Sequence, residues 1–424
     1  MLKILFTLGL LFSLLVVTYA KDHTFGIPGN KKDSSSVSLV YTSRNADSLR
    51  FSNRLIHKIS IEARPDYIMP TNSFLRGNNY KCSALKSAFS THFKYAFGFQ
   101  PNTCNYQIYN GAYQGIGLAH FSFNNQNELG NPWAFYLFQG ASIARFSPHI
   151  SLNYEWNFGV SLGWEPYHAI INPYNEVIGS KVNAYINVNF YLSWMLSEKI
   201  DLTTGLTLSH FSNGNTKFPN AGLNSTGGKA GLVYNIGKRS NKPESESRLS
   251  IPVFPRHVSY DFVLFGAWRR TGVDFQDVQI ASPKAYTVLG FGFAPMYNFG
   301  YKFRMGVSLD GVYDGSANVY TTDYEMSPKQ EFYTPSLSKQ LALGLSCRAE
   351  YVMPYFTVGL GIGSNILYGK GDLNASYQTF SLKVEVFRNS FINIGYSLKD
   401  FHEPNFLMLG FGFRFHNKYP VFYR

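Results

Sequence analysis

A histidine and a serine two residues apart are the side chains of this sequence best suited to nucleophilic chemistry. In residues 200–212 the even positions are mostly apolar until His210 and Ser212, whereas the odd positions are mostly polar or small. This alternation predicts a β-strand, in which residues i and i+2 project from one face about 6.6 Å apart at their Cα atoms. A change of rotamer then brings the imidazole within reach of the hydroxyl, so that His210 can take the proton of an attacking Ser212.

Asparagines follow this pair and supply further groups for such a site. Asn213 and Asn220 lie in the polar segment 213–223, and an asparagine amide can donate a hydrogen bond to a developing oxyanion. Asn224 begins the next alternating segment, on the parity of that segment's apolar side chains. A hairpin between the two segments can therefore place Asn224 beside His210.

The spacing of these residues resembles the signature of a known family of membrane enzymes. The string His-Phe-Ser-Asn-Gly at 210–214, followed by Pro-Asn-x-Gly at 219–222, resembles the PagL-type lipid A 3-O-deacylases. The resemblance implies an outer-membrane barrel that cleaves the ester-linked acyl chain at the 3-position of lipid A at a membrane-facing Ser-His centre. It extends over roughly residues 85–237 and leaves the second half of the chain outside.

The resemblance also implies a role for each site residue. Ser212 corresponds to the nucleophile and His210 to the base. Asn220, with Asn213 and Gly222, belongs to the segment that stabilises the oxyanion and binds the substrate.

The sequence departs from the family pattern at Asn224, where the best-described members have a glutamate that orients the histidine. An asparagine oxygen can still accept a hydrogen bond from the imidazole N–H, as in papain-like sites. It cannot stabilise an imidazolium by charge. We therefore expect a Ser-His dyad with Asn224 as the residue that orients His210.

Two similar pairs of residues are predicted to do no chemistry. His120 and Ser122 repeat the His-x-Ser spacing on an apolar parity, but no Pro-Asn-x-Gly string follows them. We interpret them as part of the side chains that meet the membrane interface. Asp400 and His402 lie near the corresponding hairpin of the second half, where they are expected at a loop tip.

Composition predicts the fold that must position the site. Aromatic residues make up 17% of the chain and charged residues only 15%, with a mean hydropathy of −0.14. After the first twenty residues there is no apolar run of 18 or more, so hydrophobic side chains must be distributed by alternation. Segments such as 89–99, 150–164 and 182–196 alternate in this way. The fold class is therefore all-β, a transmembrane antiparallel β-barrel of about 16 strands, with two tandem eight-stranded barrels as the alternative.

The chain divides into four predicted parts. Residues 1–20 read as a signal peptide, because Lys3 precedes an apolar run that ends in Ala20. Residues 21–238 form the deacylase-like half of the barrel, 239–257 a periplasmic linker, and 258–424 the second half. The long polar loops, including 213–223, are expected outside the cell.

These features favour a carboxylic ester hydrolase of the bacterial outer membrane. A formal charge of +12 suits lipid A or lipopolysaccharide as the partner, together with outer-membrane lipids, because these carry anionic head groups. Nucleic acid is not expected as a partner, nor is a metal or other cofactor, and the sequence leaves the oligomeric state open. The alternative function is a channel or structural barrel with a non-catalytic site, because about 16 strands can enclose an aqueous lumen.

Overall fold

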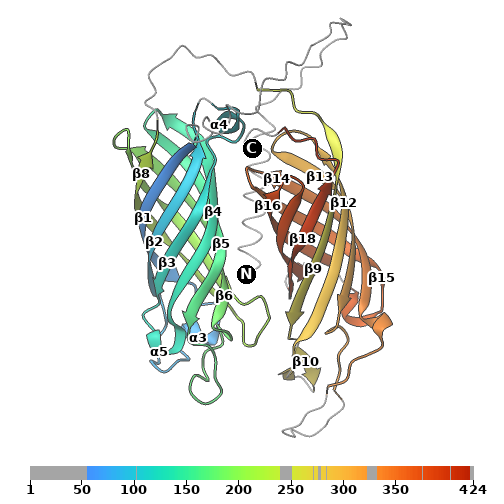
Figure 1. The fold of residues 1–424 in the computed structure, drawn as a ribbon. Helices are drawn as coiled ribbons and strands as arrows, with labels where there is room; N and C mark the ends of the chain where they lie inside the picture. Colours follow the sequence, from blue (N-terminus) through green and yellow to red (C-terminus); the bar gives the residue numbers. More distant parts are fainter. Residues whose placement is uncertain are drawn as a thin grey trace, which may run out of the picture.

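The computed structural model describes residues 55–101, 103–238, 251–270, 272–275, 278–282, 284–321, 332–374, 376–401 and 403–420. It contains two closed antiparallel β-barrels of eight strands each (Figure 1). The strands of the first barrel are β1 (Leu55–Ile68), β2 (Ser87–Phe99), β3 (Tyr113–Ser122), β4 (Gly130–Ser147), β5 (Ile150–Trp164), β6 (Val182–Met195), β7 (Ile200–Ser212) and β8 (Leu223–Ile236). Those of the second are β9 (His257–Arg269), β12 (Tyr286–Asn298), β13 (Phe303–Asp314), β14 (Leu341–Val352), β15 (Phe356–Tyr368), β16 (Ser376–Phe387), β17 (Ser390–Lys399) and β18 (Glu403–Phe415).

Each barrel is closed by the pairing of its last strand with its first. In the first barrel β8 pairs with β1, with Tyr234 opposite Ile59. In the second barrel β18 pairs with β9, with Leu409 opposite Gly266. The all-β class and the number of barrel strands are therefore confirmed. The tandem arrangement given as the alternative is the one present, and the single large barrel that we favoured is wrong.

The connections between strands differ at the two ends of the barrels. One end carries the longer segments between β5 and β6 and between β7 and β8, the short helices α3 (Ser73–Arg76) and α5 (Gln126–Leu129), and the hairpin of β10 (Gly272–Phe275) and β11 (Val278–Ala281). The other end has mostly tight turns, with α4 (Cys104–Ile108) as an exception. Two 3₁₀ turns, η2 (Leu337–Lys339) and η3 (Gly371–Leu373), complete the second barrel. We call the first of these ends the long-loop end.

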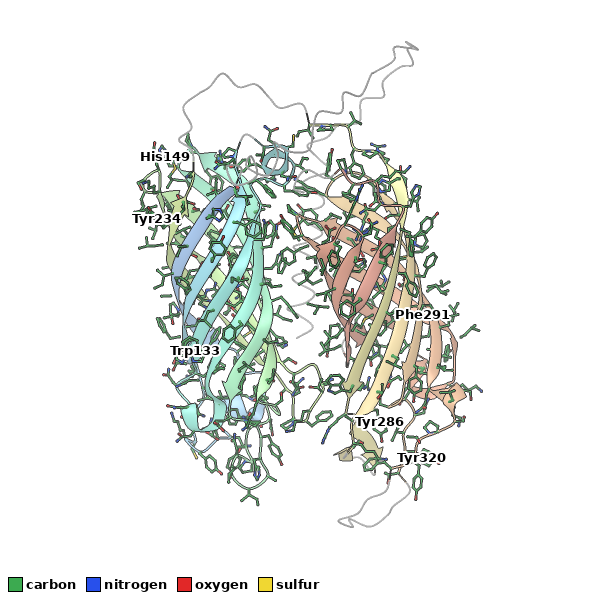
Figure 2. The ribbon with its side chains drawn as sticks, viewed as in Figure 1. Trp133, His149, Tyr234, Tyr286, Phe291 and Tyr320 are labelled. Atoms are coloured by element: carbon green, nitrogen blue, oxygen red, sulfur yellow. The ribbon has the colours of Figure 1, made fainter. Side chains whose placement is uncertain are left out.

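The alternation of the strands places an apolar belt on the outer surface and the charged side chains of the strands mostly inside. Leu206 on β7 is 70% exposed, whereas its neighbour Thr207 is 2% exposed. Side chains project all round both barrels in Figure 2, where Trp133 and Tyr234 are labelled on the first barrel and Phe291 on the second. An apolar belt of this kind suits contact with lipid.

A cluster of two carboxylates and three basic side chains lies inside each barrel. In the first barrel Glu62 contacts Arg64, Lys94 and Lys229 at 2.6 to 3.0 Å, and Lys94 also contacts Glu155 at 2.7 Å. An eight-stranded barrel is just wide enough for side chains to fill it. The interior of the first barrel is therefore packed in the part of the chain that the structure describes.

The second barrel repeats this arrangement with different residues. Asp261 contacts Arg304, Lys383 and Arg414 at 2.8 to 2.9 Å, and Glu350 contacts Arg304 and Lys383. A cavity of about 40 Å³ lies beside this cluster. The argument for a channel no longer holds, because it depended on a single barrel of about 16 strands with an aqueous lumen.

The outer faces of the two barrels contact each other. The ring of Trp156 on β5 packs edge-on against Phe356 on β15, with 5.1 Å between centroids. The Tyr154 hydroxyl lies 3.6 Å from the Met353 sulfur. The two barrels lie side by side in Figure 1, with their long-loop ends pointing the same way.

The predicted signal peptide, residues 1–20, and most of the predicted linker, residues 239–250, lie outside the described residues. The first barrel's strands end at Ile236 and the second barrel's begin at His257. The division into domains stays a prediction beyond these strand limits. Within the described residues, no helix is long and apolar enough to cross a membrane.

Candidate active site

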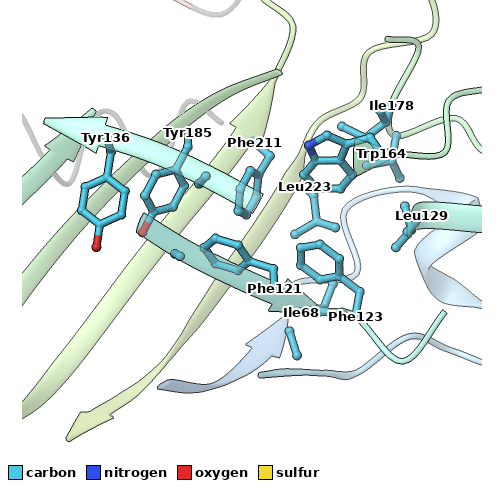
Figure 3. Packing of buried hydrophobic residues seen from close by; sticks show 14 of the residues in the cluster. Ile68, Phe121, Phe123, Leu129, Tyr136, Trp164, Ile178, Tyr185, Phe211 and Leu223 are labelled. Carbon is cyan, nitrogen blue, oxygen red and sulfur yellow. The ribbon is translucent and has the colours of Figure 1, made fainter. Parts of the chain in front are cut away.

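The end of β7 is positioned by an aromatic layer inside the first barrel. Phe211 points inward and is completely buried. Its ring stacks on Tyr185 at 5.2 Å and meets the edges of Phe121 at 5.0 Å and Trp164 at 5.1 Å (Figure 3). Because side chains alternate along a strand, the buried Phe211 directs its two neighbours, His210 and Ser212, to the outer face.

His210 is oriented by a residue of the adjacent strand. His210 and Asn224 are directly opposite each other in the pairing of β7 with β8. The His210 Nδ1 atom lies 2.8 Å from the Asn224 Oδ1 atom, and Asn224 is buried. With Nδ1–H donating to this amide oxygen, Nε2 carries the free lone pair that a general base needs.

Ser212 is bound by an asparagine from the loop between β7 and β8, residues 213–222, which we call the site loop. The Asn220 Nδ2 atom lies 2.9 Å from Ser212 Oγ, and the backbone N–H of Gly214 donates to the same oxygen at 3.1 Å. The N–H of Asn213 donates to Asn220 Oδ1 at 3.0 Å. These bonds place two N–H donors beside the hydroxyl oxygen.

The structure separates the two asparagines that the sequence grouped together. The side chain of Asn220 contacts Ser212, whereas Asn213 Nδ2 donates to the carbonyl of Lys217 at 2.7 Å and so stabilises the site loop. The Oδ1 atom of Asn213 is buried with no hydrogen-bond partner among the described residues. Asn220 is therefore the better placed of the two to contact an oxyanion.

Gly222 leaves room for the imidazole. Its φ angle is +72°, and a Cβ atom there would lie 3.1 Å from His210 Cε1. Glycine adopts a positive φ without strain and has no side chain to displace the ring. Gly222 thus contributes to the site through space and backbone shape.

A second loop packs over the site loop. The N–H groups of Ala221 and Gly222 donate to the carbonyls of Glu176 and Val177, both at 3.1 Å. Val177 is completely buried, and Glu176 accepts a hydrogen bond from the Ser73 hydroxyl at 2.7 Å. The segment between β5 and β6 therefore stabilises the strand entry that carries Gly222 and Asn224.

The structure brings His210, Ser212, Asn220, Gly222 and Asn224 to one place at the long-loop end of the first barrel. None of the described hydrogen bonds joins His210 to Ser212, whose hydroxyl is bonded to the site loop instead. Such catalytic bonds are often formed only when substrate binds. The roles of these residues stay predictions. Among the described residues there is no group of three or more His, Cys, Asp or Glu side chains that could hold a metal.

His120 and Ser122 differ from this site in their surroundings. They also end a strand at the long-loop end, but the His120 ring packs on Trp133 at 4.7 Å between centroids. No described hydrogen bond gives His120 an orienting amide. This pair offers a matched comparison for the pair on β7.

The comparison with protein families gives a match in the second barrel. Residues 258–417 match the model PagL_C, described as the acyloxyacyl hydrolase C-terminal domain. The recognition of the PagL family from sequence is therefore confirmed, but the matched range is the half of the chain that we had left outside the resemblance.

Solved structures similar to the chain include two that match about the length of one barrel. A Neisserial surface protein A structure is 10% identical, with a TM-score of 0.27, and the match covers 43% of this chain and 97% of that one. The outer membrane enzyme PagL is 14% identical, with a TM-score of 0.26 and coverages of 42% and 99%. Similarities of this size carry no argument about activity. No curated protein matches the chain.

The acyloxyacyl hydrolase match falls on the barrel that lacks the dyad. The string Pro404-Asn405 in the β17–β18 hairpin corresponds to Pro219-Asn220 in the first barrel, which makes Leu409 the equivalent of Asn224. Opposite Leu409 lies Ile394, so two aliphatic side chains occupy the places of His210 and Asn224. Asp400 accepts hydrogen bonds from Ser376, as expected of a turn residue, and His402 lies outside the described residues.

Proposed function

We propose that the first barrel is an outer-membrane ester hydrolase that removes an ester-linked acyl chain from lipid A. The observation that carries this proposal is the set of contacts from His210 to Asn224 and from Ser212 to Asn220, on the outer face of a barrel strand. Polar and ionisable groups are unfavourable on a lipid-facing surface, and where they occur they tend to be functional. The acyloxyacyl hydrolase match in the second barrel supports the same class of chemistry.

The proposed reaction uses the groups in the places where they are found. Ser212 Oγ attacks the ester carbonyl while His210 Nε2 takes its proton, and Asn224 keeps Nδ1 as the donor. The Asn220 amide and the Gly214 N–H stabilise the oxyanion. His210 then gives the proton to the departing sugar alkoxide, and a water molecule releases the fatty acid from Ser212 by the same steps.

The position of the site suits a lipid of the outer leaflet. His210 and Ser212 lie near the end of β7, at the long-loop end, which is extracellular in outer-membrane barrels. An acyl chain can reach Ser212 from the apolar belt, while the phosphorylated head group remains among the loops at this end. This places the scissile ester at the boundary between the belt and the loops.

The proposal is tested by comparing Ser212→Ala with Ser122→Ala, which removes the serine of the other His-x-Ser pair. We expect the wild type and Ser122→Ala to remove one ester-linked acyl chain from lipid A. Ser212→Ala should lower the rate at least about 100-fold, because the nucleophile is lost. Mass spectrometry of lipid A from expressing cells measures this. Identical acylation patterns in cells with and without the wild-type chain would overturn the proposal.

A further inference from the structure

The second barrel has an apolar side chain where the first barrel needs empty space. By the correspondence of the two Pro-Asn strings, Leu407 is the equivalent of Gly222. Gly222 leaves room for the His210 ring, whereas Leu407 is paired with Tyr396. Asn405, the equivalent of Asn220, accepts a hydrogen bond from Arg269 within the second barrel. The second barrel's hairpin therefore keeps the Pro-Asn string but has aliphatic residues in place of the histidine and the asparagine that orients it.

Leu407 contacts the site loop of the first barrel. A Cβ atom at Gly214 would lie 2.8 Å from Leu407 Cγ and 3.0 Å from its Cδ1, and the φ angle of Gly214 is +65°. Gly214 is also the residue whose N–H donates to Ser212 Oγ. The leucine that replaces Gly222 in the second barrel thus packs two residues from the proposed nucleophile of the first.

A second contact between the barrels lies next to the first. The N–H of Arg270, which follows β9, donates to the carbonyl of Asn215 at 3.3 Å. The side chain of Asn215 in turn accepts a hydrogen bond from Asn220 Nδ2 at 3.1 Å. A short series of contacts therefore leads from the second barrel through the site loop to Ser212. In Figure 1 the yellow-green segment beside β6 reaches toward the second barrel.

We propose that the second barrel is a catalytically silent copy whose Leu407 positions the site loop for catalysis by the first barrel. The site loop contains three asparagines and two glycines, so it has many conformations when free. Contacts that restrict the loop before substrate arrives keep the oxyanion donors in place, and small displacements of such groups lower rates strongly. Leu407 touches no reacting atom, so it is a positioning residue. This inference rests on the proposed function.

The test compares Leu407→Ala with Leu409→Ala in the purified full-length chain. Leu409 lies on the same outer face of β18, is 46% exposed and has no described contact with the site loop. We expect Leu407→Ala to lower both kcat on lipid A and the rate at which a fluorophosphonate labels Ser212, each about tenfold. Leu407→Met should restore both rates. Leu409→Ala should leave both rates unchanged, and the melting temperatures of the two alanine variants should agree.

Three results separate this inference from the function on which it rests. If the wild type shows no labelling that depends on Ser212, the proposed function and the inference both fail. If the wild type is labelled but Leu407→Ala reacts as fast as Leu409→Ala, only the inference fails. If Leu407→Ala does not fold, Leu407→Val takes its place, and rates equal to the wild type would then overturn the inference.

Discussion

At the scale of the residue, the least usual feature of the site is the amide that orients His210. Asn224 Oδ1 lies 2.8 Å from His210 Nδ1, which selects the tautomer needed for a general base. An amide does not provide the negative charge that stabilises an imidazolium after proton transfer. Asn224 therefore orients His210 but does not stabilise the imidazolium by charge.

Changing Asn224 separates these two contributions. Asn224→Asp keeps the size and the accepting oxygen and adds a charge, so we expect kcat to rise about tenfold through a more stable imidazolium. Asn224→Leu, which copies Leu409 of the second barrel, should lower kcat at least tenfold, because the tautomer is no longer selected. Single-turnover deacylation of lipid A measures both variants. Equal rates for Asn224→Leu and the wild type would show that Asn224 does not orient the base.

The sequence predicted which residues form the site of the first barrel, but it did not predict the contacts that the second barrel makes with the site loop. His210, Ser212, Asn220 and Asn224 lie close together in sequence, so their spacing on one hairpin was enough to group them. Leu407 and Arg270 come from another barrel. On a single sequence, Leu407 is one more apolar residue on an outward parity, and nothing in its surroundings distinguishes it from Leu409.

At the scale of the element, the hairpin of β7 and β8 depends on the aromatic layer below it. Phe211 lies between His210 and Ser212 in sequence and packs against four buried rings. Phe211→Ala should cost about 3–5 kcal/mol of unfolding free energy through the cavity that it leaves. We also expect deacylation to fall, because the strand end can then rotate. Urea unfolding in detergent micelles measures the stability.

The control for Phe211→Ala is the same substitution at a phenylalanine on the outer face of the first barrel. Phe135 on β4 is 53% exposed on the outer face. Phe135→Ala removes the same side chain but leaves no internal cavity, so its effect on the unfolding free energy should be clearly smaller. Similar losses for the two variants would mean that the aromatic layer does not stabilise the end of β7.

Alternation along the chain predicted the strands well, but it did not determine how many strands close into each barrel. A period of two tells which face of a strand is apolar, and segments such as 150–164 and 182–196 are strands as predicted. Barrel size depends on which strand pairs with the first, and that choice depends on long-range register. The pairing of Tyr234 with Ile59 has no local signature in either segment.

At the scale of the whole molecule, both barrels use the same plan for their interior. Each contains a cluster of two buried carboxylates and three basic side chains, namely Glu62, Glu155, Arg64, Lys94 and Lys229 in the first, and Asp261, Glu350, Arg304, Lys383 and Arg414 in the second. Buried charges of this kind must be paired to be tolerated. The two barrels therefore share one way of pairing their interior charges, although the His210–Ser212 pair is on the first barrel.

Packed interiors also predict that the molecule does not conduct ions. Water and ions would have to pass Glu62, Lys94 and Glu155 in the first barrel. The Lys94 Nζ atom lies 2.7 Å from a carboxylate oxygen of each glutamate. In the second barrel the cavity beside Asp261 is about 40 Å³, which is little more than the space of a few water molecules. We therefore expect no steady conductance steps from the purified chain in planar bilayers, under conditions in which a porin inserted as a control conducts. Stable conductance that is unchanged in Ser212→Ala would contradict the packed interiors and would favour transport over hydrolysis.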